Sequence, residues 1–231
     1  YFQATRGGGN GDYHVVVLAP GTVQELADYT VKAFEIADKY RVVVMILGDG
    51  YLGQMSEPCV LPEPVKEFPA KPWALTGKTK DRDSNILASL RLGTDTELNE
   101  HVKNELFAVY AEIAKNETKY ENFMCDDADF IICAYGTSAR VCKKAVKDLR
   151  AQGIKAGLFR PITLWPFPED ALEAVCEKAK KVLTVEMSMG QLFQDVRMYS
   201  GKKKSECDFY GEPGGIIPKL DVIVEKVKSY V

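Results

Sequence analysis

The chain has 231 residues, 46% of them hydrophobic and 27% charged, which is the balance of an ordinary soluble globular protein with one large domain or two modest ones. Its 30 basic and 33 acidic side chains are well mixed and leave a net charge of −3, which argues against a nucleic-acid-binding protein, because phosphates require a concentrated basic face. No apolar run approaches the ~20 residues that span a bilayer, and no secretory signal opens the sequence, so a membrane protein is not expected either.

The first part of the chain predicts a strand, a helix and a second strand. The apolar run 14–19 predicts a short buried strand. Thr22 followed three residues later by Glu25 forms a capping box, and the apolar residues that recur at helical spacing after it predict a helix. A fully apolar run at 42–47 predicts the next strand. This order predicts that the two strands are parallel.

The triplet Gly48-Asp49-Gly50 follows that second strand, where thiamine enzymes can hold a metal-bound diphosphate. Such a motif needs a pair of asparagines further along the chain, and only Asn85 lies near the required position. The triplet also leads into a proline-rich segment and shows no helical pattern after it. We therefore interpret it as a tight turn at a strand end and assign it no metal.

The middle of the chain predicts a connection and a long helix. Prolines at 58, 62, 64, 69 and 72 exclude regular structure and predict an extended connection between two domains. Residues 73–93 are expected to be irregular. A wide apolar face then predicts a helix from about Thr96 to Lys119.

The last part of the chain alternates strand and helix patterns, which predicts a three-layer α/β domain with a mostly parallel sheet. The expected strands are 130–134, 154–159, 181–186 and an edge strand at 206–210. The expected helices are 139–152, 169–180, 191–199 and 220–231, and a stiff loop is expected at 160–168.

The segment Tyr135-Gly136-Thr137-Ser138 is a candidate binding turn, because it follows a predicted parallel strand and opens a helix. Backbone N–H groups and the positive end of the helix dipole face outward there, at the sheet edge where ligands bind in open α/β folds. The alternative is that the turn is purely structural and that Thr137 caps its own helix. Both interpretations remain open from the sequence.

No self-sufficient active site can be recognised in the sequence. The six cysteines contain no CxxC pair, which indicates buried free thiols in a reducing cytoplasm and excludes iron–sulfur ligation by this chain. His14 and His101 lack a spaced set of metal ligands, and no serine or cysteine nucleophile motif occurs. We therefore expect a subunit that supplies one wall of a shared site.

Several short sequence motifs, in order along the chain, resemble those of the alpha subunit of 2-oxoacid:ferredoxin oxidoreductases. They are 9–13 (GNGDY), 17–20 (VLAP), 22–25 (TVQE), 49–55 (DGYLGQM), 73–77 (WALTG), 134–140 (AYGTSAR), 160–168 (RPITLWPFP), 185–191 (VEMSMGQ) and 209–215 (FYGEPGG). Within that family the sequence is most similar to subunits for 2-oxoisovalerate (3-methyl-2-oxobutanoate) and related branched-chain 2-oxoacids.

The resemblance implies a domain organisation. Residues 1–56 would be the C-terminal part of a thiamine-pyrimidine-binding domain, 57–125 a proline-rich linker with a long helix, and 126–231 a transketolase-C-terminal-like domain. Most of the pyrimidine-binding domain, with the acidic residue that activates the cofactor, would lie upstream of residue 1. We therefore assign no catalytic acid to any residue present.

The resemblance also implies the reaction and the partners. Thiamine diphosphate and Mg²⁺ would be shared with a beta subunit, and iron–sulfur clusters would lie on a ferredoxin-like subunit. Coenzyme A would be the co-substrate and ferredoxin the electron acceptor in the oxidative decarboxylation of a 2-oxoacid. This chain alone would bind no cofactor and would be inactive. Two other hypotheses remain: a stand-alone α/β ligand-binding or regulatory module, and the equivalent subunit of a lipoyl-linked 2-oxoacid dehydrogenase.

We expect a small set of residues to lie near the substrate or coenzyme A. They are Tyr135, Gly136, Thr137, Ser138, Arg160, Thr163 and Gln191. Arg160 follows a strand end and its planar fork suits a carboxylate or a phosphate. The alternative for Arg160 is a structural ion pair with Glu186, at the end of the next strand.

Overall fold

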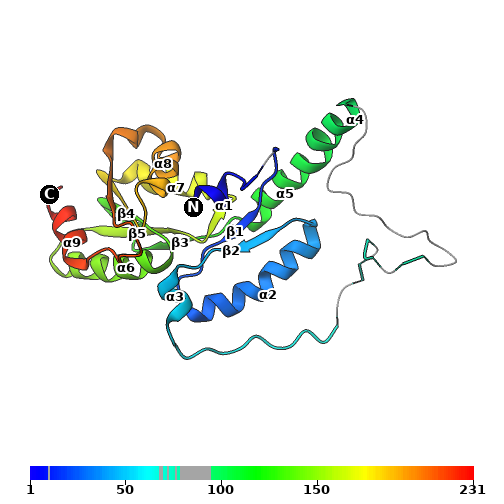
Figure 1. Ribbon diagram of the computed structural model, residues 1–231. Helices are drawn as coiled ribbons and strands as arrows, with labels where there is room; N and C mark the ends of the chain where they lie inside the picture. The colour runs from blue at the N-terminus through cyan, green and yellow to red at the C-terminus, as the bar shows by residue number, and fades with distance from the viewer. Residues whose placement is uncertain (10, 68–69, 72, 76, 79–94) are drawn as a thin grey trace.

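The computed structural model describes residues 1–9, 11–67, 70–71, 73–75, 77–78 and 95–231, and it contains two α/β units that lie side by side (Figure 1). A three-stranded sheet organises the first unit and a five-stranded sheet the second. A short N-terminal helix, α1 (Phe2–Thr5), lies beside the second unit.

The predicted strand–helix–strand unit forms most of the first sheet. Strands β1 (Val16–Leu18) and β2 (Val44–Ile46) are parallel and are connected by helix α2 (Val23–Tyr40), as predicted. The Thr22 hydroxyl accepts a hydrogen bond from the Glu25 N–H at 3.1 Å, so the predicted N-terminal cap is confirmed. The Glu25 carboxylate reaches back past Thr22 and accepts from the Gly21 N–H at 2.6 Å.

The third strand of this sheet comes from far along the chain. Strand β6 (Thr163–Trp165) pairs antiparallel with β1, which gives the order β2-β1-β6. The sequence predicted only a stiff loop at 160–168, and this prediction is wrong for β6. Because residues 163–165 lie between Pro161 and Pro166 and outside a longer apolar run, no local pattern marks a strand there, and the pairing with β1 makes them one.

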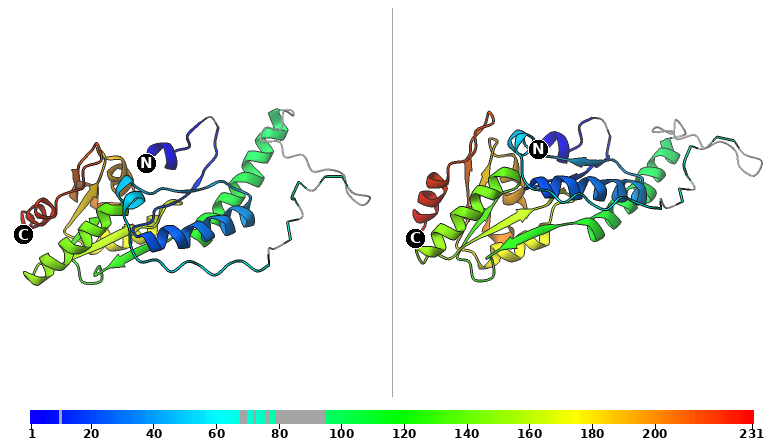
Figure 2. Two further views of the ribbon diagram at one scale, coloured as in Figure 1. Left: turned by 60° about the horizontal axis from the view of Figure 1, so that its bottom comes forward. Right: turned by 90° about the horizontal axis from the view of Figure 1, so that it is seen from below.

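The segment after β2 also differs from the prediction. Residues Gly50–Gln54 form a short helix, α3, capped by Asp49, whose side chain accepts from the Leu52 N–H at 3.0 Å. The turn predicted for Gly48-Asp49-Gly50 is therefore wrong, because Asp49 is the N-cap of a helix. The proline-containing chain that follows is extended and largely exposed over its described residues (Figure 2).

The predicted long helix is confirmed as one helical run in three parts: α4 (Asp95–Glu100), a π-helical turn (His101–Leu106) and α5 (Phe107–Glu117). Tyr110 and Ile113 of α5 are buried against Val16, Leu18 and Ile36, so this helix covers the first sheet. The irregular stretch predicted at 73–93 lies almost entirely outside the described residues.

The second sheet has the order β3-β5-β4-β7-β8. Strands β4 (Phe130–Cys133), β5 (Ala156–Pro161), β7 (Lys181–Glu186) and β8 (Cys207–Gly211) are parallel, whereas β3 (Tyr120–Phe123) is antiparallel. The mostly parallel sheet and the edge position of β8 were predicted. Strand β3 was not, because its residues YENF lack an apolar run.

Helices cover both faces of this sheet and make the predicted three-layer fold. Helices α6 (Gly136–Ala151) and α9 (Leu220–Lys228) pack on one face, and α7 (Glu169–Lys178) and α8 (Gln191–Tyr199) on the other (Figure 1). Along β4 the side chains alternate between the two cores, since Ile132 faces α6 and Ile131 faces α7 and α8. Helix α6 begins at Gly136, three residues before the predicted start, so residues 136–138 are its first turn.

Candidate functional site

The first turn of α6 lies at the carboxyl end of β4, where the sequence predicted a binding turn, and a carboxylate of the first unit already contacts it. Asp49 Oδ2 accepts a hydrogen bond from the Thr137 N–H at 2.9 Å, and Asp49 Oδ1 accepts from the Thr137 hydroxyl at 2.8 Å. The structural alternative, in which Thr137 caps its own helix, is therefore wrong, because the Thr137 hydroxyl donates to Asp49. One backbone N–H of this turn, that of Thr137, therefore contacts an anionic group, and this group is a side chain of the protein itself.

Gly136 makes this approach possible. Its φ is +58°, in the left-handed region that favours glycine, and a Cβ at this position would lie 2.9 Å from Asp49 Oδ2. Any larger residue at 136 would displace the carboxylate.

Arg160 is buried, with a side chain 5% exposed, and joins the two units through a pair of carboxylates. Its guanidinium donates to Glu25 in a bidentate contact and to Glu121 Oε2 at 3.2 Å. It does not pair with Glu186, so the predicted partner is wrong. The physical reason is that Glu186 accepts from the N–H groups of Leu192 and Phe193 at 2.9 and 3.0 Å, and thereby caps α8.

The Glu25–Arg160 pair sets the protonation state of Glu25. Burial raises the pKa of the Glu25 carboxyl, but the hydrogen bonds from Arg160 and from the Gly21 N–H outweigh burial and hold the pKa below its ordinary value. The Arg160 fork is thus engaged by the protein's own carboxylates.

A third polar link closes the same seam between the units. Arg140, in the second turn of α6, donates to Glu57 at 2.6 and 3.1 Å and to the Gly21 carbonyl at 3.2 Å. The contacts of Asp49, Arg160 and Arg140 together fix the first unit against the carboxyl ends of β4 and β5. We call this set of contacts the seam.

The other predicted site residues are separated. Thr163 is buried and exchanges hydrogen bonds with the backbone of Lys119 at 2.9 and 3.2 Å, which holds β6 in place. Gln191, at the start of α8, accepts from the Phe2 N–H at 3.1 Å. Ser138 is buried in the first turn of α6. The structure thus places residues 135–138 and Arg160 along the seam, and Gln191 beside α1.

Asp195 of α8 is a buried carboxylate that sequence reasoning missed. It accepts from the Tyr1 hydroxyl at 2.5 Å and forms an ion pair with Arg6, and the two contacts anchor α1 on the second unit. The Tyr1 ring lies 5.8 Å from the ring of Tyr135, so the N-terminal residues reach the end of β4. Burial raises the pKa of the Tyr1 hydroxyl well above its usual range, and the negative charge of Asp195 adds to this.

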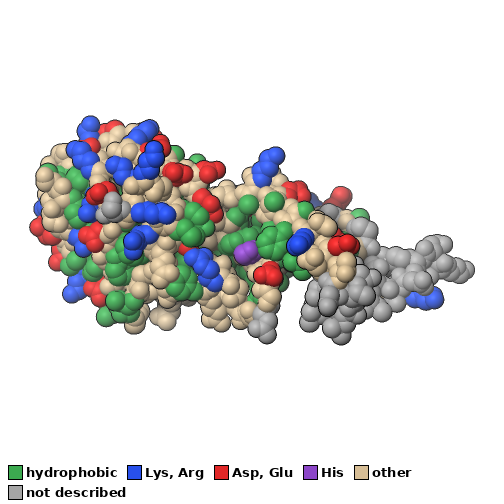
Figure 3. All heavy atoms as spheres, turned by 90° about the horizontal axis from the view of Figure 1, so that it is seen from above, with side chains coloured by type: hydrophobic (Ala, Val, Ile, Leu, Met, Phe, Trp, Pro, Cys, Tyr) green, Lys and Arg blue, Asp and Glu red, His purple; other side chains and the backbone are tan. Residues whose placement is uncertain are grey.

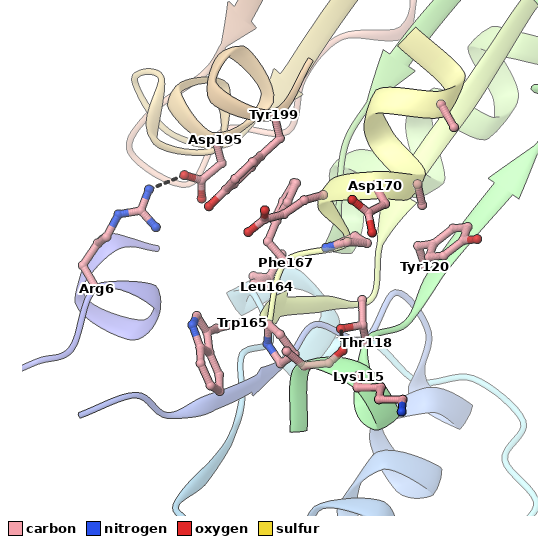
Figure 4. A pocket seen from close by; sticks show the side chains of 16 residues that line it. Arg6, Lys115, Thr118, Tyr120, Leu164, Trp165, Phe167, Asp170, Asp195 and Tyr199 are labelled. Atoms are coloured by element: carbon pink, nitrogen blue, oxygen red, sulfur yellow. Dashed lines mark hydrogen bonds and ion pairs between the residues drawn. The ribbon is translucent and has the colours of Figure 1, made fainter. Parts of the chain in front are cut away.

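A cavity of about 900 Å³ opens between these elements (Figure 4). Its walls come from the residue after α1, from the end of α5 and the start of β3, from β6 with the segment that joins it to α7, and from α7 and α8. They include Arg6, Lys115, Trp165, Asp195 and Tyr199. Its volume suits a small molecule or a side-chain cluster of another protein. None of the predicted site residues lines it. Its walls combine residues up to 193 positions apart, from Arg6 to Tyr199, which no local pattern reveals.

The residues that the structure describes do not fit a metal-bound diphosphate. They contain no group of three or more His, Cys, Asp or Glu side chains that could hold a metal ion. The carboxylate of the Gly48-Asp49-Gly50 triplet has both oxygens engaged by α3 and α6. Among these residues there is also no helix with the length and apolarity needed to cross a membrane.

Two family models match the chain in sequence order. Residues 2–121 match the thiamine-diphosphate-binding domain of pyruvate flavodoxin/ferredoxin oxidoreductases, and residues 128–223 match core domain II of pyruvate:ferredoxin oxidoreductase.

Curated relatives cover nearly all of the chain. It is 41% identical to the ketoisovalerate oxidoreductase subunit VorB of Methanothermobacter thermautotrophicus, over 99% of this chain and 64% of that protein. It is 34% identical to the 2-oxoglutarate synthase subunit KorA of Methanocaldococcus jannaschii, over 91% of this chain and 62% of that protein. The chain therefore spans slightly less than two thirds of these relatives.

The fold is similar to that of the 2-oxoglutarate:ferredoxin oxidoreductase from Magnetococcus marinus, a structure with 2-oxoglutarate, coenzyme A and succinyl-CoA bound. The TM-score is 0.75 with 23% identity, over 99% of this chain and 44% of that one. The shared fold covers both α/β units.

Proposed function

Because the chain belongs to the pyruvate flavodoxin/ferredoxin oxidoreductase family, we propose that it forms part of the alpha subunit of a thiamine-diphosphate-dependent 2-oxoacid:ferredoxin oxidoreductase. The observation that carries the proposal is the match of both family models, in order, to residues 2–121 and 128–223. The alpha/beta architecture of the two units supports it. The complete enzyme would oxidatively decarboxylate a 2-oxoacid, transfer the acyl group to coenzyme A and reduce ferredoxin.

The substrate that we propose is a branched-chain 2-oxoacid such as 2-oxoisovalerate. Identity to the two ketoisovalerate oxidoreductase subunits is 41 and 42%, against 30–34% for the 2-oxoglutarate synthase subunits of the archaeal relatives. The higher identity to the ketoisovalerate oxidoreductase subunits supports a branched-chain substrate.

We propose that this chain contributes walls of a shared site and that other polypeptides complete it. The absence of a fitting metal site among the described residues supports this division of labour. Thiamine diphosphate and Mg²⁺ would be held together with a beta subunit, and electrons would leave through a ferredoxin-like iron–sulfur subunit to ferredoxin. The complex would be cytoplasmic.

Within that shared site we place Tyr135, Gly136, Thr137, Ser138 and Gln191 nearest the substrate or coenzyme A. They lie at the carboxyl ends of β4 and β7, the sheet edge where ligands bind in this fold class. Arg160 and Thr163 were expected in the same set, but we place them further from the ligand, since their polar groups are engaged by Glu25, Glu121 and Lys119.

Reconstitution tests the proposal. The full-length subunit that contains this sequence is combined with its partner subunits and assayed for viologen-dye reduction with pyruvate, 2-oxoglutarate and 2-oxoisovalerate, each with coenzyme A. We expect the highest kcat/KM with 2-oxoisovalerate. Preference for 2-oxoglutarate would contradict the substrate assignment, and dependence on a lipoyl-bearing partner would contradict the ferredoxin-linked reaction.

The 231-residue chain alone provides a second test. We expect it to show no 2-oxoacid-dependent dye reduction and no thiamine diphosphate binding by calorimetry, because the described residues form no metal-diphosphate site. Turnover by the pure chain would overturn the shared-site proposal.

A further inference from the structure

We propose that Asp49 is a positioning residue, which fixes the first turn of α6 and thereby sets the wall formed by residues 135–138. The inference rests on the proposed function, because that wall belongs to the shared site. Asp49 itself contacts only protein groups: the Leu52 N–H, the Thr137 N–H and the Thr137 hydroxyl, at 3.0, 2.9 and 2.8 Å. It therefore acts through Thr137 and its neighbours, not on a reacting atom.

The helix α6 lacks a cap of its own. Its N-cap residue is Tyr135, which makes no side-chain capping bond, and its first turn contains no acidic residue. Helices usually satisfy their first N–H groups with Ser, Thr, Asp or Asn at the N-cap. Here Asp49, 88 positions away in the chain, supplies the carboxylate to Thr137. The cap of α6 thus comes from the other α/β unit.

This arrangement makes the start of α6 depend on the position of the first unit. Asp49 follows β2, which is paired with β1, and its carboxylate also caps α3. Both β2 and α3 of the first unit therefore fix the position of Asp49. Tyr135, directly before the turn, packs against Tyr1. Burial raises the pKa of the Tyr135 hydroxyl, and the negative charges of Glu186 and Asp49 raise it further. Asp49 therefore affects Tyr135 electrostatically as well as binding Thr137.

Gly136, which precedes Thr137, indicates that Asp49 has a role in the contact with α6 and does not serve only to stabilise α3. If Asp49 served α3 alone, residue 136 would be under no constraint from it. Instead a Cβ at Gly136 would lie 2.9 Å from Asp49 Oδ2. Gly153, just past the other end of α6, also has a positive φ of +80° but has nothing within 4 Å of an added Cβ. The two glycines therefore differ in their relation to Asp49.

The experiment compares three variants in the reconstituted complex of the full-length subunit: Asp49→Asn, Gly136→Ala, and Gly153→Ala as matched control. Hydrogen exchange by mass spectrometry reports on residues 136–140, and steady-state assays give KM and kcat for the 2-oxoacid and for coenzyme A. Asp49→Asn keeps the shape of the side chain and removes its charge. Gly136→Ala keeps the carboxylate and displaces it.

We expect Asp49→Asn and Gly136→Ala to speed exchange at 136–140 about tenfold, the effect of losing one capping interaction. We expect both to raise the KM of the 2-oxoacid or of coenzyme A by roughly tenfold with kcat changed less than about twofold, as for lost positioning of a bound ligand. Gly153→Ala should leave KM at the parent value.

Unchanged exchange and unchanged KM in Asp49→Asn and Gly136→Ala would overturn the inference, and so would an equal KM change in Gly153→Ala. A lower kcat at constant KM would also overturn it, since that is the result of a smaller folded fraction. Failure of the proposed function is separate, because the parent complex would then show no 2-oxoacid oxidation while the exchange result at 136–140 still reports on Asp49.

Discussion

At the scale of single residues, the seam contains a buried charge, the guanidinium of Arg160. A buried charge is tolerated only where partners compensate for its lost hydration. Glu25 and Glu121 provide that compensation, and Gly21 leaves room for it, because a Cβ at Gly21 would lie 3.0 Å from the guanidinium carbon. Arg160 therefore matters to stability through the carboxylates that it neutralises.

Replacing this arginine should destabilise the chain strongly. For Arg160→Met we expect a loss of about 2–3 kcal/mol in the free energy of unfolding, somewhat below the ~3–5 kcal/mol of a fully buried pair because both carboxylates keep some exposure. Urea unfolding followed by circular dichroism measures it. Lys143→Met, which removes an exposed partner of the same Glu121, is the control and should cost under about 1 kcal/mol. Equal losses of unfolding free energy in Arg160→Met and Lys143→Met would show that the buried position of Arg160 adds nothing to its ion pairs.

The Glu25–Arg160 pair also predicts a pH dependence. The folded pKa of Glu25 lies below its unfolded value, so its contribution to stability is complete above about pH 5 and is lost as the pH falls through the folded pKa. We therefore expect the difference in Tm between the parent and Glu25→Gln to be largest near neutral pH and to shrink below about pH 4. A difference that stays constant from pH 6 to pH 3 would contradict this assignment.

The cysteines divide by burial. Cys133, Cys142 and Cys176 are buried and burial raises the pKa of each thiol, that of Cys176 to about 12, whereas Cys59 is exposed. In the native chain at pH 8 we expect Cys59 to react with a disulfide reagent within seconds and those three only after unfolding. A stopped-flow absorbance trace, with Cys59→Ser as the control, tests this. Rapid reaction of more than one thiol after that substitution would contradict the burial that we describe.

At the scale of elements, segments with a helical period or within an apolar run were predictable, and short segments with neither feature were not. Helix α2, the long helical run ending with α5, and strands β1, β4 and β7 all carry enough apolar residues to show their period. The elements β3, β6 and α3 have three to five residues each, and their pairing or capping partners lie elsewhere in the chain. Tertiary contacts, not local propensity, create these elements.

Helices α6 and α8 share an unusual way of starting. Their N-cap residues, Tyr135 and Gly190, provide no side-chain cap. Each receives a carboxylate instead, from Asp49 for α6 and from Glu186 for α8. At this edge of the second sheet the helix dipoles are thus neutralised by side chains from strand ends.

The α8 cap gives a prediction at this scale. Glu186→Gln should lower the free energy of unfolding by about 1–2 kcal/mol, because the amide offers one acceptor to the two N–H groups and carries no charge. Hydrogen exchange of residues 191–194 should be faster than in the parent, with urea unfolding as the stability readout. Glu225→Gln, on the exposed face of α9, is the control and should stay within about 0.5 kcal/mol. An equally small effect at Glu186 would show that α8 does not need this cap.

At the scale of the whole molecule, the fold class and the family could be predicted and the arrangement of the candidate site could not. Local patterns in the sequence show the alternation of strands and helices. The seam, in contrast, joins residues far apart in the chain, such as Glu57 with Arg140, 83 positions apart, and Glu25 with Arg160, 135 positions apart. A single sequence gives no signal for such pairs. For that reason Glu186 was assigned to the wrong partner, and Asp195 and the cavity beside it were missed.

The surface agrees with the charge pattern read from the sequence. On the face shown in Figure 3, basic and acidic side chains are intermingled over the second unit, and hydrophobic side chains show between them. Several large hydrophobic residues are exposed, among them Phe34, Val60 and Leu61. Single exposed hydrophobic residues of this kind are normal on protein surfaces.

Strand β6 has a consequence for how the chain comes to its final shape. It is made by residues 163–165, well inside the second unit, yet it is the third strand of the first sheet. During synthesis on the ribosome, more than a hundred residues must therefore be added after β2 before β6 can complete the first sheet. A gene divided between the two family segments, after residue 121, would yield an amino-terminal product with β1 open along one edge, prone to pair with other chains until the second product arrived.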